Sequence, residues 1–232
     1  MGRRIYDWQA SRSLSDFRLE GRGELQLGDD GALLIRTYDC GPLKRATTVW
    51  LKNVVLPKAF QVDWTFRSNS AAGNSMSIFN ALPLGLKNIF EDPRPDALYC
   101  DIASFRKMIA HSVGFHRSVY GKPSVLRKLG GRVPEHWGMM IWPDPPEFEK
   151  ESTMSNATEP LAPADKGKRH NFRLIRRENT IDFFVNGRQV HAWTENGQYP
   201  YWKEPLSGGH MAFRNFTGFA DDFYQSIVIE EL

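Results

Sequence analysis

The sequence is poor in cysteine, with only Cys40 and Cys100, and neither lies in a CxxC or Cys/His pattern. A zinc site built from closely spaced cysteines and histidines is therefore not expected. The two cysteines can form one disulfide or remain as two buried thiols, and the sequence leaves both readings open.

Long hydrophobic runs are also lacking. No stretch of about 18 or more apolar residues occurs, and the first ten residues, MGRRIYDWQA, contain no apolar signal core. We therefore expect a soluble protein with no membrane partner. Its location stays open, because a periplasmic or secreted protein whose signal peptide is absent from this sequence looks the same as a cytoplasmic one.

Positive and negative charges nearly cancel, and the formal net charge is only +3. Nucleic-acid partners usually require a large basic patch, so we expect none. The surplus is nevertheless local, because residues 101–140 contain seven Lys or Arg and two acids. A basic site for a smaller anionic partner remains compatible with this pattern.

Several catalytic motifs are missing as well: there is no GxSxG, no P-loop, no GxGxxG after a strand and no HExxH. Hydrolysis of a glycoside normally needs two carboxylates about 5 to 10 Å apart, and no ExDxxE-like pair marks them here. Asp63, Asp101 and Asp182 are single acids on or near expected strands, and any two of them can meet in three dimensions.

Short alternating or apolar runs separated by turn residues dominate what is present, and they predict strands. Asn186-Gly187 is the strongest hairpin signal, because both central residues of a type I′ turn need positive φ. The runs lie at 24–28, 31–38, 47–56, 60–66, 170–193, 208–218 and 221–232, with long loops expected at 80–99, which includes one helical turn, and at 142–169. We predict an all-β antiparallel sandwich of the jelly-roll type, as a single domain over residues 1–232.

The stretch HSVGFHRSVYGKPSVLRK, residues 111–128, has no acid in it. As a strand, its period of two places His111 and Arg117 on one face, and Ser112 and His116 on the other. Residues 124–131 would pair back as a hairpin, with Arg127 and Lys128 pointing to opposite faces. Solvated edge charges are the alternative explanation.

These residue types suit β-elimination from a uronate, which needs a base and cations that stabilise the enolate-like charge. We take His111 or His116 as the base and Tyr120 as the acid. The substrate-binding residues are Arg117, Arg127 and Lys128, which clamp the carboxylate, with Ser112 beside them. The same types also occur in grooves that only bind sugars.

Aromatic residues are plentiful, and Trp137, Trp142 and Tyr201 are candidates for stacking on sugar rings, although anchoring of loops by buried rings explains them equally well. No cofactor is required. A structural calcium ion on Asp221 or Asp222 is a weaker expectation, because calcium prefers hard oxygen ligands.

The sequence resembles the YesU-like family, a domain family of poorly defined function with a concanavalin A-like lectin/glucanase fold. The resemblance lies in the order and spacing of AHSVGFHR (110–117), SVLRKLGG (124–131), IDFFVNGRQVHAW (181–193), SGGHMAFRNFTG (207–218) and FYQSIVI (223–229), with VDWTF (62–66) and SIFNALPLG (77–85) before them. His111, Ser112, Arg117, Arg127 and Lys128 match positions of the family motifs. The 142–169 excursion is longer than in the family, and Val125 stands where a polar residue is typical.

The resemblance implies a jelly roll and a bacterial carbohydrate context. Our first hypothesis is an enzyme, a polysaccharide lyase or a glycoside hydrolase, that acts on an acidic oligo- or polysaccharide. The alternative is a noncatalytic carbohydrate-binding domain. A third reading is a structural or interaction domain whose basic groove is incidental. The oligomeric state is left open.

Overall fold

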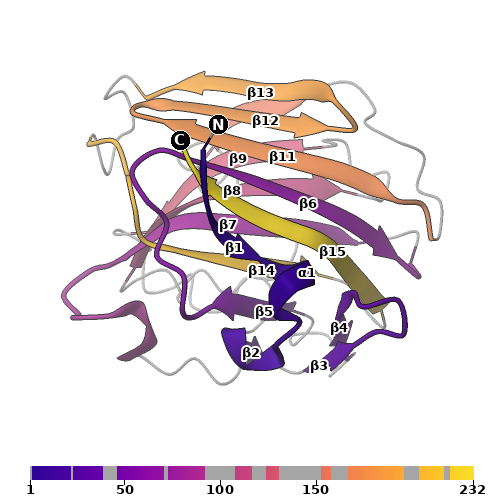
Figure 1. Cartoon of the computed structure of the whole chain (residues 1–232). Helices are drawn as coiled ribbons and strands as arrows, with labels where there is room; N and C mark the ends of the chain where they lie inside the picture. The colour runs from indigo at the N-terminus through magenta and orange to yellow at the C-terminus, as the bar shows by residue number, and fades with distance from the viewer. Residues whose placement is uncertain are drawn as a thin grey trace, which may run out of the picture.

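Two antiparallel β-sheets lie face to face in the computed structural model (Figure 1). The structure describes residues 2–21, 23–38, 46–70, 73–91, 108–116, 124–130, 153–157, 167–195, 204–216 and 220–232. The predicted all-β sandwich is confirmed.

The first sheet has eight strands within the described residues, and we call it the eight-stranded sheet. In spatial order it consists of β13 (Arg188–Thr194), β12 (Thr180–Val185), β11 (His170–Arg177), β6 (Phe60–Ser68), β15 (Ala220–Glu231), β4 (Leu33–Thr37) and β3 (Gly23–Leu27), and β1 (Arg3–Asp7) also pairs with β15. Because β1 and β15 are antiparallel, the two ends of the chain lie close together (Figure 1).

The second sheet has seven strands in the described part of the chain, and we call it the seven-stranded sheet. Its order is β10 (Thr153–Ala157), β9 (Ser124–Gly130), β8 (Met108–His116), β7 (Asn74–Pro83), β14 (His210–Phe216), β5 (Ala46–Leu51) and β2 (Phe17–Gly21). The short helical elements are α1 (Trp8–Ser11), η1 (Leu14–Asp16) and η2 (Ile89–Glu91). The helical turn expected within 80–99 corresponds to η2.

The main core fills the space between the sheets. Trp64 and Phe172 of the eight-stranded sheet stack with ring centroids 5.2 Å apart, and Phe213 of the seven-stranded sheet packs edge-on against Trp64 at 5.8 Å. Val113 and Phe115 belong to the same buried cluster. One face of β8 therefore points toward the other sheet, as its period of two predicts.

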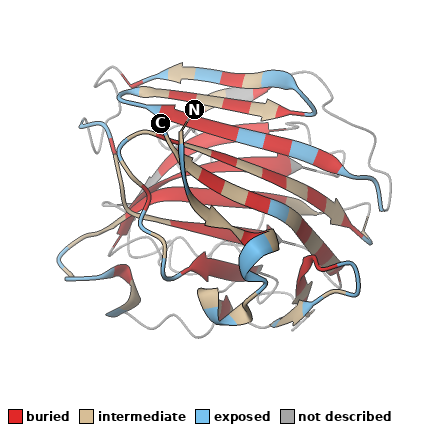
Figure 2. Ribbon diagram, in the orientation of Figure 1, coloured by how far each residue is buried: buried red, intermediate tan, exposed pale blue. Residues whose placement is uncertain are grey.

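The two sheets differ in how they are buried. Strands β6, β11, β12 and β15 alternate between buried and more exposed residues, whereas the described residues of β8 and most of those in β7 are buried on both faces (Figure 2). A second buried cluster explains part of this difference. Trp50, Met76, Ile78 and Ala212 of the seven-stranded sheet pack there with Ile89 of η2, on the face turned away from the main core.

The predicted hairpin turn is present, and two strands differ from the predicted boundaries. Asn186 and Gly187 have φ of 51° and 81°, as the predicted type I′ hairpin between β12 and β13 requires. Strand β10 lies inside the stretch predicted as a loop at 142–169, because pairing with β9 supplies its backbone bonds although its sequence, TMSNA, has no apolar alternation. Strand β7 continues to Pro83, past the loop start predicted at Asn80.

The first twenty residues were given no strands from the sequence, yet they form β1 and β2. Both strands have only five residues. RRIYD of β1 lacks a period of two, whereas FRLEG of β2 alternates over a very short stretch, and both strands pair with distant ones, β15 and β5. No helix in the described ranges is long and apolar enough to cross a lipid bilayer.

Candidate functional site

The hairpin of β8 and β9 divides the predicted site residues between two faces of the seven-stranded sheet. His111 lies opposite Lys128, and Ser112 lies opposite Arg127. Because successive side chains alternate, the first pair points between the sheets and the second points away from the eight-stranded sheet, onto what we call the outer face. The predicted opposite orientation of Arg127 and Lys128 is thus confirmed, and the structure does not bring all four side chains to one face.

The inward pair belongs to a buried group that we call the inner ion cluster: His111, Lys128, Arg176 and Glu195. Glu195 follows β13 and places its carboxylate between the cations. Lys128 Nζ donates to Glu195 Oε1 at 2.8 Å, and Arg176 Nη2 donates to Glu195 Oε2 at 2.5 Å. His111 Nε2 lies 3.2 Å from Glu195 Oε1. The cluster joins β8 and β9 of one sheet to β11 and β13 of the other.

The remaining donors of the inner ion cluster hold the chain before β14. Lys128 Nζ also donates to the carbonyl of Glu204 at 2.9 Å, and Arg176 Nη2 donates to the carbonyl of Leu206 at 2.7 Å. His111 Nδ1 lies 3.2 Å from Asn80 Oδ1. The role of the cluster visible in these contacts is to tie the sheets and this connection together.

Protonation within the inner ion cluster follows from burial. Desolvation lowers the pKa of the fully buried His111 to about 4, and the hydrogen bond to the Glu195 carboxylate only partly opposes it. Burial by itself raises the pKa of Glu195, but the bonds from His111 and Lys128 outweigh it and lower the pKa to about 2. Near neutral pH, Glu195 is therefore ionised and His111 is neutral, so its single N–H is donated either to Glu195 from Nε2 or to Asn80 from Nδ1, but not to both.

A second buried histidine, His191 of β13, lies between two serines. Ser124 Oγ donates to the carbonyl of Gly114 at 2.5 Å, so its single proton is used and His191 Nε2, 2.9 Å away, must be the donor to it. Nδ1 then accepts from Ser155 Oγ at 2.9 Å. Burial lowers the pKa of His191 to about 4, so the neutral Nε2–H tautomer is held in place.

The outer face carries two rows of side chains that cross the strands. Register places Arg127, Ser112, Ile78, Ala212 and Trp50 in the first row, from β9 to β5. The second row, from β8 to β2, contains Gly114, Met76, Arg214, Thr48 and Glu20. Cations therefore lie over β9 and β14, an acid and an indole lie at the β2–β5 end, and small or apolar residues lie between them.

Contacts at the β2–β5 end fix several of these side chains. Trp50 Nε1 donates to Glu20 Oε2 at 2.9 Å, and Arg214 Nη1 donates to Thr48 Oγ1 at 2.8 Å. Arg18 of β2 lies over the ring of Phe90 at 5.2 Å and donates to the Phe90 carbonyl at 3.1 Å. The η2 turn thus packs on this end of the outer face.

Ser112 differs from these tied side chains. It is 1% exposed, and its Oγ has no hydrogen-bond partner among the described residues. Arg127, directly opposite on β9, is 5% exposed. A buried hydroxyl without a partner costs free energy, so it is a feature that a bound polar group would relieve.

Several predicted residues lie outside the described part of the chain. These are Arg117, Tyr120, Trp137, Trp142 and Tyr201, together with Cys40 and Cys100. His116 ends β8, where only its backbone is described. Their predicted roles stay predictions.

Asp222, the candidate calcium ligand, is fully buried on β15, and Asp221 instead pairs with Arg36 at 2.7 Å. Among the residues that the structure describes, no group of three or more His, Cys, Asp or Glu side chains is placed to hold a metal ion. The described residues therefore provide no set of ligands for the expected calcium ion.

Sequence reasoning missed Glu195, Arg176, Arg214 and Glu20. Arg214 could have been found, because the alternation of MAFRNF in β14 places it on the face opposite Phe213. Glu195 carries no local signal, because it follows the last residue of β13 and meets its partners only across the sandwich.

No protein-family model matches the chain, and no protein of curated function matches it in sequence. Solved structures do match. A Bacillus subtilis protein of unknown function with a galectin-like fold is 18% identical, with a TM-score of 0.74 over 99% of this chain and 96% of that one. A carbohydrate binding module from Bacillus subtilis is 9% identical, with a TM-score of 0.54 over 93% and 96%. A Bacillus licheniformis β-glucanase is 8% identical, with a TM-score of 0.57 over 100% of both chains.

At these low sequence identities, the comparisons show similarity of fold only. The chain has the galectin-like, or concanavalin A-like, β-sandwich fold, as the resemblance in the sequence predicted. This fold is shared by a protein that binds carbohydrate and by a glucanase, so it fits more than one activity.

Proposed function

We propose that this protein acts on an acidic oligo- or polysaccharide held on the outer face of the seven-stranded sheet, and that it cleaves the glycosidic bond by β-elimination or by hydrolysis. One observation carries the proposal: the buried Ser112 hydroxyl, without a partner among the described residues, lies directly opposite Arg127. A sugar hydroxyl or carboxylate would satisfy Ser112, and a guanidinium binds a carboxylate through two parallel hydrogen bonds.

The fold supports a carbohydrate ligand, because a carbohydrate binding module and a β-glucanase share it. Arg127 and Arg214, both on the outer face, support a negatively charged one. In an elimination, a base removes the proton from the carbon next to the carboxylate, and the cations stabilise the charge that develops on that carboxylate.

The roles of Ser112, Arg127, His111 and Lys128 follow from the face on which each lies, and the other roles are those expected from the sequence. In this proposal Ser112 and Arg127 bind the sugar, with Arg117 as a second cation, and His116 and Tyr120 are the base and the acid. Trp137, Trp142 and Tyr201 stack on sugar rings. His111 and Lys128 hold β8 and β9 from the inner side, because both are buried and bonded to Glu195.

A noncatalytic carbohydrate-binding domain is the second candidate. Of the described strand residues on the outer face, Glu20 is the only carboxylate, whereas hydrolysis of a glycoside normally uses two. Glu20 also already accepts from Trp50. A domain that binds and does not cleave needs no such pair.

The test is an ultraviolet absorbance screen for unsaturated uronides with purified protein and a panel of uronate-containing polysaccharides and oligomers. A rise that is lost in His116→Ala supports elimination, and release of reducing ends without that rise supports hydrolysis. Binding by calorimetry without products, weakened in Arg127→Gln, supports the binding domain. Arg173→Gln, on the exposed face of the other sheet, is the matched control. If the protein neither forms products from any of these polymers nor binds any of them, the proposal is refuted.

A further inference from the structure

The inner surfaces of β7 and β14 become polar toward one end of the main core. Ser75 and Ser77 of β7 alternate with Met76 and point between the sheets, and Asn215 of β14 lies directly opposite Ser75. Ser75 is 9% exposed and Asn215 is fully buried. These polar side chains therefore lie inside the sandwich, on the opposite side of the sheet from the outer face.

Hydrogen bonding fixes the orientation of the Asn215 amide. Tyr224 of β15 donates its hydroxyl proton to Asn215 Oδ1 at 2.7 Å, so the amide oxygen faces the eight-stranded sheet. The amide nitrogen then points elsewhere, and Asn215 Nδ2 has no hydrogen-bond partner among the described residues. The same is true of Ser75 Oγ. Two neighbouring buried groups, one a donor and one able to accept or donate, are thus left unsatisfied by protein atoms.

A small cavity adjoins Ser75, and Tyr224, which bonds Asn215, also lines it. Its volume is about 10 Å³, which is close to the smallest space that admits one water molecule and too small for any larger polar ligand. The lining includes Ser75 and Ser77 of β7, Tyr224 of β15 and aromatic rings such as Trp64 and Phe172. Ser75 and Ser77 can be partners of a water molecule there, and most of the other lining residues are aromatic.

We propose that this cavity is a binding site for a single structural water molecule. The water donates a hydrogen bond to Ser75 Oγ, and Ser77 offers a second polar contact in the lining. We assign Asn215 Nδ2 as its donor, because Asn215 lies directly opposite Ser75 and this nitrogen has no partner among the described residues. The water thereby links β7 to β14, the neighbouring strands whose other face carries Met76 and Arg214. The site is independent of the proposed carbohydrate function, because it lies between the sheets.

The test counts water molecules with long residence times by oxygen-17 magnetic relaxation dispersion on the full chain. Ser75→Val removes the hydroxyl and fills the space, so we expect one long-lived water fewer than in the wild type. Ser15→Val, at an exposed serine, is the control and should leave the number unchanged. An equal number in folded Ser75→Val and wild type would overturn the proposal.

A high-resolution crystal structure of the wild type gives a second test that needs no variant. We expect a water molecule within hydrogen-bonding distance of both Ser75 Oγ and Asn215 Nδ2. A structure in which these atoms bond to protein groups, with no water in the cavity, would refute the inference even if Ser75→Val fails to fold.

Discussion

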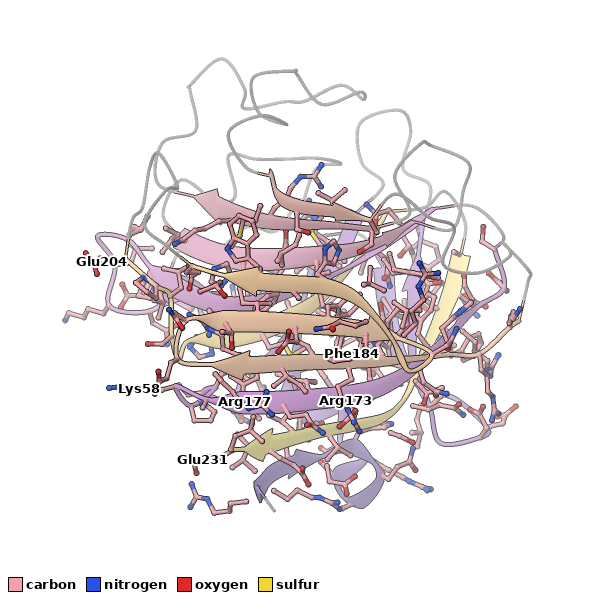
Figure 3. The ribbon with its side chains drawn as sticks, turned by 90° about the horizontal axis from the view of Figure 1, so that it is seen from above. Lys58, Arg173, Arg177, Phe184, Glu204 and Glu231 are labelled. Carbon is pink, nitrogen blue, oxygen red and sulfur yellow. The ribbon has the colours of Figure 1, made fainter. Side chains whose placement is uncertain are left out.

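Arg173 and Arg176 lie three residues apart on strand β11, and each pairs with a carboxylate, yet the two ion pairs have opposite surroundings. Arg173 Nε is 2.7 Å from Asp63 Oδ1, with side chains 52% and 32% exposed. Arg176 Nη2 is 2.5 Å from Glu195 Oε2, with side chains 0% and 3% exposed. Arg173 and Arg177 are labelled on this sheet in Figure 3.

The difference shows that the side of the sheet, rather than the residue types or the distance, decides what an ion pair contributes. Water screens the Arg173–Asp63 pair, and exposed pairs of this kind contribute little to stability. The Arg176–Glu195 pair has lost its water. Its charges depend on each other and on Lys128, and removing one leaves the others buried without compensation.

The largest effect is expected from Glu195→Gln, which keeps the shape of the side chain and removes its charge. Lys128 and Arg176 then lose the buried carboxylate that they share, and we expect a loss of about 3–5 kcal/mol in the free energy of unfolding. Urea denaturation measures it. A loss no greater than that of an exposed pair would mean that the inner ion cluster does not depend on its charge.

Replacing the cluster by apolar residues sharpens the comparison. The triple variant Glu195→Leu, Lys128→Met, Arg176→Met leaves no buried charge among these positions, so we expect it to be more stable than Glu195→Gln by about 3 kcal/mol or more. The same urea titration measures this difference. If the triple variant is the less stable of the two, the bonds to the Glu204 and Leu206 carbonyls matter more than the buried charge.

Acid should destabilise the protein through its buried histidines. The pKa of His191 is about 4 in the folded state, against about 6.5 when unfolded. The unfolded state therefore binds more protons in this window, and stability falls as the pH drops from about 6.5 toward 4. His111 shifts in the same direction.

A variant of His191 distinguishes its contribution to the loss of stability in acid from that of His111. His191→Gln can keep bonds to Ser124 and Ser155 but does not titrate, so its loss of stability between pH 7 and pH 5 should be smaller than that of the wild type by about 2 kcal/mol. Thermal or urea unfolding at both pH values measures it. Equal losses in the two proteins would show that His191 is not held neutral.

The smallest effect belongs to the exposed pair. Asp63→Asn should change the free energy of unfolding by less than about 1 kcal/mol, and added salt should reduce even this difference. Urea unfolding at low and high salt measures both. A loss comparable to that of Glu195→Gln would remove the contrast between the two sides of β11.

Local patterns predicted much of the fold. Alternation marked the strands, Asn186-Gly187 marked a hairpin, and the period of two placed His111 and Ser112 on opposite faces. Prediction was weaker at β10, whose sequence TMSNA has no period and becomes a strand only by pairing with β9. The candidate site was predicted in part, since Ser112 and Arg127 are opposite each other, whereas His111 and Lys128 turn inward to Glu195.

The sequence by itself determined the fold class and the faces of each strand, because alternation and turn residues act over a few neighbouring positions. Only the tertiary structure decided which face is buried against what. Glu195 meets His111 and Lys128 across 84 and 67 residues of chain. The described residues of β8 and most of those in β7 are buried on both faces, although these strands resemble those of the other sheet. Burial determines the pKa values and the contribution of each ion pair to stability. Burial in turn depends on packing between distant segments, which no local pattern encodes.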